Sequence, residues 1–125
     1  MTESTDKGDK WSVPWKTEMP GTSSCSNLLR LKDGRLLLTH NPSKPPIRSP
    51  LTTRVSADEG KTWGAPLELA QAIIPGVDDI VRGRQVTYPS SVLMPDGTVL
   101  IVWTEITIAP QEQWGKIHWA RVKLD

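Results

Sequence analysis

The sequence predicts an all-β protein built from four-stranded antiparallel blades of a propeller. Three observations predict this fold class: an eight-residue motif recurs 52 residues later, two Asp-Gly pairs each stand between apolar runs, and turn residues are abundant. A repeat of about 50 residues suits propeller blades of four strands. Nine glycines and eleven prolines in 125 residues exceed their average share of about 12%, which favours many turns and few long helices.

The recurring motif reads S-x-D-x-G-x-x-W in residues 4–11 and again in residues 56–63. An aspartate carboxylate can accept hydrogen bonds from backbone N–H groups a residue or two further on, and glycine tolerates the positive φ of such a turn. The serine hydroxyl can tie the strand end to the loop, while tryptophan covers it with a large apolar face. We expect a structural turn rather than an ion site, because Ca²⁺ requires several more oxygens than one loop offers. The motif residues are Ser4, Asp6, Gly8 and Trp11, then Ser56, Asp58, Gly60, Thr62 and Trp63.

The expected strands follow from apolar runs and from two hairpin signals. Asp33-Gly34 and Asp96-Gly97 each join two apolar runs, which is a strong hairpin signal. Alternation of apolar and polar residues supports a strand near the end of the chain. The expected strands are 11–18, then 24–31, 35–40, 50–57 and 61–70, then 86–94, 98–105 and 115–123.

These strands divide the chain into parts of three blades. Residues 1–18 are expected to end one blade, residues 24–70 to form a full blade, and residues 86–125 to form a last blade that lacks its fourth strand. Four prolines make 41–50 a stiff loop, and residues 71–85 are a longer connection with one helical turn. Repeat folds need about three units or more, so we expect the terminal part of a larger propeller whose remainder is needed for closure.

Charge and composition exclude several classes of function. Fifteen Lys and Arg against fourteen Asp and Glu give a net charge of +1 and a pI of about 7.9, which argues against a nucleic-acid partner. No apolar stretch approaches the ~18–20 residues of a membrane span, and no signal peptide is visible. The single cysteine, Cys25, excludes an intrachain disulfide and a cysteine-cluster metal site. We expect a soluble domain without metal or cofactor, and the compartment stays open.

The two motifs resemble the Asp boxes of the sialidase-like (BNR repeat) superfamily, and the order of elements resembles the C-terminal third of such a six-bladed propeller. Asn41-Pro42, Arg48 and the run 51–55 resemble the stretch that carries the third arginine of the family's carboxylate-binding triad. Tyr88 lies where sialidases have their catalytic tyrosine. Glu105 resembles the glutamate that supports the first arginine of the triad.

The resemblance implies a glycoside hydrolase of exo-α-sialidase type, which cleaves terminal sialic acid or a related acidic sugar. Arg48 would bind the substrate carboxylate, because guanidinium and carboxylate pair in a bidentate geometry. Tyr88 would be the nucleophile, which avoids the repulsion that a carboxylate nucleophile would meet. The family's acid, base and other two arginines lie on earlier blades and are not located in this sequence. We therefore expect the segment to be inactive alone.

Other functions stay open at this stage. The parent protein could instead be a non-catalytic glycan-binding propeller, or a purely structural or interaction repeat. Arg48 could be a solvated loop arginine, Tyr88 could pack between strands with its hydroxyl at the rim, and Glu105 could be a surface strand end. Arg82 and Arg84 are further candidates for the rim of a binding site.

Overall fold

The chain folds into two antiparallel sheets. In residues 1–45, 47–71, 84–109 and 112–124, which the computed structural model describes, there are seven strands and no helix, so no membrane-spanning helix occurs there. Sheet A contains β1 (Asn27–Arg30), β2 (Leu36–His40), β3 (Leu51–Ser56) and β4 (Leu67–Ala70). Sheet B contains β5 (Arg84–Leu93), β6 (Val99–Ala109) and β7 (Glu112–Val122). The predicted all-β, blade-like fold class is confirmed.

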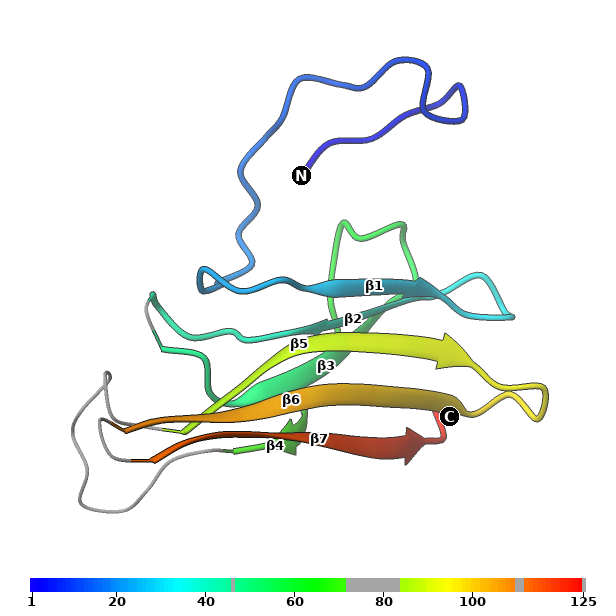
Figure 1. The fold of residues 1–125 in the computed structure, drawn as a ribbon. Coiled ribbons are helices and arrows are strands. Elements are labelled where there is room, and N and C mark those ends of the chain that lie inside the picture. Colours follow the sequence, from blue (N-terminus) through cyan, green and yellow to red (C-terminus); the bar gives the residue numbers. More distant parts are fainter. Residues whose placement is uncertain (46, 72–83, 110–111, 125) are drawn as a thin grey trace.

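Each sheet is a meander in which neighbours in sequence are neighbours in space (Figure 1). The Asp-Gly hairpins form as predicted, because glycine supplies the positive φ that each turn requires. Gly34, at φ 93°, donates its N–H to the carbonyl of Leu31 over 3.1 Å. Gly97, at φ 84°, donates to the carbonyl of Met94 over 3.0 Å. These turns set the registers of β1 with β2 and of β5 with β6.

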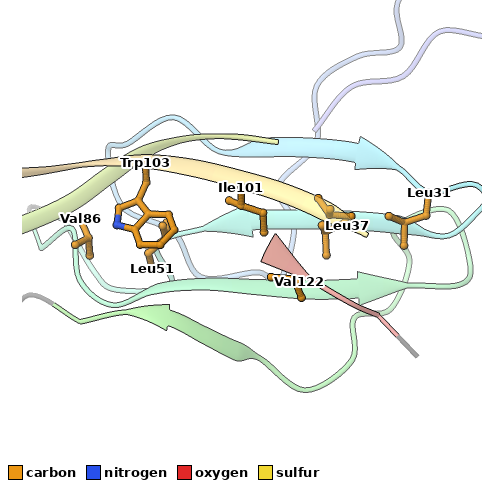
Figure 2. Close-up of a cluster of buried hydrophobic side chains, with 8 residues drawn as sticks. Leu31, Leu37, Leu51, Val86, Ile101, Trp103 and Val122 are labelled. Atoms are coloured by element: carbon orange, nitrogen blue, oxygen red, sulfur yellow. The ribbon is translucent and has the colours of Figure 1, made fainter. Parts of the chain in front are cut away.

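The core lies between the two sheets (Figure 2). Alternation along each strand sends one set of side chains toward the other sheet. Leu37 and Leu51 of sheet A meet Ile101 and Trp103 of sheet B, and the first three of these side chains are fully buried. Burial of these apolar side chains holds the sheets together.

Two expected strands are wrong in whole or in part. Residues 11–18 form no strand: they bond to residues 1–3 through Ser12 and Trp15, and Pro14 has no N–H to donate. The strand expected over 61–70 begins only at Leu67. Its first residues belong to the turn of the second motif, and Pro66 again lacks a donor.

The remaining expectations have different outcomes. The loop expected over 41–50 contains no strand in its described residues, as predicted. Residues 72–83 of the expected long connection, including its helical turn, lie outside the described residues, and β5 begins at Arg84. Sheet B has three described strands. The assignment of residues 1–18 to the end of a further blade stays a prediction.

Candidate functional site

The two repeated motifs form matching turns. In the first, Ser4 Oγ donates to Asp6 Oδ1 (2.8 Å) and accepts from the Gly8 N–H (2.8 Å). Asp6 Oδ1 also accepts from the N–H of Lys10 over 2.9 Å. This hydrogen bond spans four residues, whereas one or two were expected for a simple Asx turn. The indole N–H of Trp11 closes the turn onto the Gly8 carbonyl over 3.0 Å.

The second motif repeats the serine and aspartate hydrogen bonds of the first and adds one contact. Ser56 Oγ bridges Asp58 Oδ1 (2.8 Å) and the Gly60 N–H (2.9 Å). Asp58 accepts from both the backbone and the hydroxyl of Thr62, over 2.8 and 2.6 Å. Hydrogen bonds to the charged carboxylate, led by the Thr62 hydroxyl, lower the pKa of Asp58 from 3.8 to about 2. All these oxygens are used within the turn, which fits a structural role.

Tyr88 stands at an irregularity of β5. The register with β6 shifts between Thr87 and Ser90, so Tyr88 occupies a β-bulge. Its φ of 55° is uncommon for a residue with a side chain, and its side chain remains 46% exposed. Strained backbone and bulges gather at functional sites, where they aim a side chain out of the regular ladder.

Arg48 and Tyr88, separated by 40 positions in the sequence, lie in direct contact. Arg48 Nη1 donates to Tyr88 Oη over 2.8 Å, and the guanidinium carbon stands 5.5 Å from the centre of the tyrosine ring. Arg48 Nη2 donates to the carbonyl of Ser23 over 3.0 Å, which fixes the guanidinium from a second direction. The sequence-based candidates for carboxylate binding and for nucleophilic attack therefore lie side by side.

Asn41 clamps the loop that carries Arg48 onto the strand that carries Tyr88. Its side-chain amide is buried and donates to the carbonyls of Pro50 and Val86, both over 2.8 Å. The Val86 N–H in turn donates to the Arg48 carbonyl over 3.0 Å. Both backbone groups of Val86 thus bond to this loop on the open edge of β5, and the two sheets are joined beside the site.

Glu105 lies against a histidine of the neighbouring strand. Its Oε2 lies 2.7 Å from Nε2 of His118 on β7, and the two form an ion pair when the imidazole is protonated. His118 stacks on Trp103, with ring centres 5.9 Å apart and planes 16° from parallel. Glu105 pairs with Val86 in the sheet register, two residues before Tyr88, so it lies at the same end of sheet B. Its role as an arginine-supporting residue stays a prediction.

Several contributors were missed by sequence reasoning. The Ser23 carbonyl and the Asn41 amide carry no sequence signal for their role, although Asn41 directly precedes the proline-rich loop. The β6–β7 register places His118 opposite Trp103 and Lys116 opposite Glu105, so the contact of His118 with Glu105 is a diagonal one that the register alone does not predict. Arg82 lies outside the described residues, and Arg84 begins β5 without a described side chain.

The site offers a cation, a phenol and no described metal ligands. Among the described residues, no group of three or more His, Cys, Asp or Glu could hold a metal ion. A guanidinium beside a phenol can bind a carboxylate and can stabilise negative charge on the phenol oxygen. Both groups reach solvent, so a ligand can approach them. The arrangement suits recognition of an acidic group next to a phenol.

Comparisons with known proteins agree with this fold. Residues 1–101 match the family model described as a BNR repeat-like domain. No curated protein sequence matches the chain significantly. Among solved structures, an ulvan lyase presented as a new family of polysaccharide lyase is similar, with a TM-score of 0.51 and 15% sequence identity. The match covers 66% of this chain and 18% of the lyase chain. At this identity the likeness shows the fold alone.

Proposed function

The chain belongs to the BNR repeat-like family, and on this premise we propose that it supplies part of an acidic-sugar site in a carbohydrate-active propeller. In this site Arg48 binds the carboxylate of the sugar, and Tyr88 is the nucleophile of an exo-α-sialidase type hydrolysis. The observation that carries the proposal is the 2.8 Å hydrogen bond from Arg48 to the Tyr88 hydroxyl. It joins the two groups that this chemistry requires.

Physical chemistry supports the division of roles. A sialoside bears a carboxylate on its anomeric carbon, so a carboxylate nucleophile would meet like charge there, whereas a neutral phenol does not. Tyrosine has a pKa of about 10 and needs a base to attack at neutral pH. No such base is assigned among the described residues, so the proposal expects the base, the acid and further arginines to come from other blades. The 125-residue chain should bind without turning over.

A second candidate uses the same hydrogen bond in another reaction. In elimination from an acidic polysaccharide, Arg48 would hold the carboxylate while the deprotonated Tyr88 oxygen takes the proton from the carbon next to it. The electron pair of that carbon–hydrogen bond forms the double bond, the carbon–oxygen bond to the neighbouring sugar breaks, and the released oxygen takes up a proton. The 2.8 Å contact would place a carboxylate bound by Arg48 next to the Tyr88 oxygen. Elimination leaves a conjugated double bond that absorbs in the ultraviolet, whereas hydrolysis does not, so the products of the parent protein distinguish the two reactions.

The test uses the fact that Tyr88 is the only tyrosine in the chain. Tyrosine labelled with ¹³C at Cζ gives one NMR signal, which reports directly on the site. We expect N-acetylneuraminic acid to shift this signal and neutral N-acetylglucosamine to leave it in place. Arg48→Ala should abolish the shift. A signal that does not move, or that moves equally with the neutral sugar, would show that the site does not recognise acidic sugars.

A matched control and an activity assay complete the test. Arg30 lies on β1 and pairs with Glu59 over 2.7 Å, so Arg30→Ala removes one exposed arginine away from the site and should leave the shift unchanged. An aryl sialoside should not be turned over by the 125-residue chain. If it were, and Tyr88→Phe abolished the turnover, the assignment of Tyr88 would stand and the expected need for other blades would be wrong.

A further inference from the structure

His40 is a buried histidine that the proposed site does not use. It ends β2, and Leu37 of the same strand packs in the core between the sheets. The alternation of side chains therefore turns His40 to the opposite side of sheet A, where it is only 3% exposed. Among the described residues, no group forms a hydrogen bond with its Nε2 atom. A charged imidazolium is costly to bury without partners, so this environment favours the neutral form.

A segment that we call the strap, residues 20–24, covers this position. It leads into β1 at the end of sheet A where β2 finishes (Figure 1). The N–H of Thr22 donates to the carbonyl of Asn41, the residue after His40, over 3.3 Å. The carbonyl of Pro20 lies near enough to the imidazole to act on its protonation. His40 is therefore enclosed between the strap and sheet A.

The same strap holds the guanidinium of Arg48. The carbonyl of Ser23 accepts from Arg48 Nη2 over 3.0 Å, while Nη1 of this guanidinium donates to Tyr88 Oη. The hydroxyl of Ser24 bonds to the hydroxyl of Thr87, the residue before Tyr88. The strap thus contacts the buried imidazole on one side and the pair of Arg48 and Tyr88 on the other. Displacement of the strap would release a hydrogen bond that orients the guanidinium.

The charge on Arg54 makes a proton on His40 still more costly. Arg54 lies on β3, diagonal to His40 on the same side of sheet A, and its Nη1 donates to the Gly64 carbonyl over 3.0 Å. Burial first, and then the positive charge of Arg54, lower the pKa of His40 below its usual 6.5, and the Pro20 carbonyl raises this pKa by less. Among the described residues, the pKa of His40 responds to none of the other charged side chains on the elements around β2: Glu18 ahead of the strap, Arg30 on β1, Lys44 and Arg48 in the loop after β2, and Glu68 on β4.

We propose that His40 is a positioning residue for Arg48: while the imidazole is neutral the strap stays on sheet A, and protonation of the imidazole displaces the strap and releases the Ser23 carbonyl from Arg48. The enclosed position cannot hydrate an imidazolium, whereas displacement of the strap opens it to water. An uncovered His40 binds a proton near pH 6.5, so acid favours the displaced state by up to about tenfold per pH unit below that value. The proposal goes beyond the function proposed above, because it concerns the geometry of Arg48 and Tyr88 whether or not the site binds an acidic sugar.

The ¹³Cζ signal of Tyr88, the only tyrosine, reports this change in the chain without any sugar, so the result is separate from the test of sugar binding. Between about pH 7.5 and about pH 5 a phenol stays neutral and most carboxylates stay charged, because their usual pKa values are about 10 and about 4. We expect the signal to move with a midpoint below pH 6.5 in the wild type. It should stay constant in His40→Gln, which cannot be protonated. A wild-type signal that is constant over this range overturns the proposal.

His118 provides the matched control, because the chain has two histidines and His118 is partly exposed beside Glu105. His118→Gln should keep the pH response of Tyr88, and its single imidazole signal then belongs to His40. The midpoints of that imidazole and of Tyr88 should coincide in this variant, a comparison that stands even if His40→Gln does not fold. Arg54→Gln should move both midpoints to higher pH together, because it removes a charge that opposes the proton. Loss of the response in His118→Gln, or midpoints that differ, contradicts the proposal.

Hydrogen exchange of the Thr22 amide separates displacement of the strap from a direct effect of charge on Tyr88. Corrected for the intrinsic pH dependence of exchange, the protection of this amide should fall by up to about tenfold per pH unit below 6.5. The Gly34 amide, which bonds to the Leu31 carbonyl in the turn between β1 and β2, should keep its protection. A Tyr88 signal that moves while Thr22 stays protected would show that the strap does not carry the effect. Equal loss of protection at Gly34 would show general unfolding in acid, and either result overturns the proposal.

Discussion

Removal of the Asn41 amide should destabilise the protein more than its position in a loop suggests. Asn41 is 3% exposed and donates to two carbonyls over 2.8 Å each, one of them in a fully buried bond to Val86. A buried polar group that loses its partner costs about 1–3 kcal/mol, and each hydrogen bond contributes about 1 kcal/mol net. The Pro50 carbonyl is only partly buried, so water offsets part of its loss. We expect Asn41→Ala to lower the free energy of unfolding by about 2–4 kcal/mol, measured by urea denaturation and tryptophan fluorescence.

A second variant tests the donor role itself. Asn41→Asp keeps the size but replaces both donors with a buried carboxylate that faces two carbonyl oxygens. Burial raises the pKa of that carboxyl in the folded state, so this variant should gain stability as the pH falls from 7 toward 4. Asn27→Ala is the matched control: Asn27 is the other asparagine, it is half-buried and accepts from Ser91, and its loss should cost about 1 kcal/mol or less. A loss below about 0.5 kcal/mol in Asn41→Ala, or no pH dependence in Asn41→Asp, would refute the reasoning.

Three further outcomes follow from the structure. The pKa of Asp58 is lowered to about 2, so its contribution to stability is present above about pH 4 and is lost as the pH falls toward 2. In Asp58→Asn, the free energy of unfolding should therefore change less with pH between about 4 and 2, as measured by acid unfolding. The same pH dependence in the variant as in the wild type would contradict this prediction. Tyr88→Gly should be more stable than Tyr88→Ala by about 1 kcal/mol, because both lack the side chain and only glycine adopts a φ of 55° freely; equal stabilities in urea would refute the strain. Leu37→Ala should cost about 2–5 kcal/mol in the same assay, since Leu37 is fully buried between the sheets, and a loss under 1 kcal/mol would show that the sheets do not depend on this core.

The fold was predictable because its signals are local. The motif of residues 4–11 and 56–63 and the two Asp-Gly turns each complete their hydrogen bonds within a few residues, so composition and spacing identify them. The strand expected over 11–18 failed for the opposite reason. A strand requires a partner ladder, and the sequence of this segment does not show that only residues 1–3 lie beside it.

The sequence predicted the residues of the candidate site one by one, but not that Arg48 and Tyr88 touch. Arg48 and Tyr88 meet because a loop of sheet A crosses the edge of β5, and this crossing depends on Asn41 and on the β-bulge. Neither dependence has a sequence signature, since an asparagine before a proline and a tyrosine before a proline occur in many loops and strands. The contact of Glu105 with His118 was no easier to predict, because the β6–β7 register places Lys116 rather than His118 opposite Glu105.

The meander order of each sheet determines how the molecule opens. All ladders join strands that are consecutive in the chain, so each sheet can form by hairpin closure on a timescale of about 1–10 µs per turn. The two sheets are joined by their shared apolar core and, along the seam, by bonds between residues far apart in sequence, such as Asn41 with Val86 and Asn27 with Ser91. Because the core is shared, we expect the seam to open locally before the two sheets unfold together in hydrogen exchange. Amides along the seam should exchange before those at the centre of β6, and the contact of Arg48 with Tyr88 separates in that early opening.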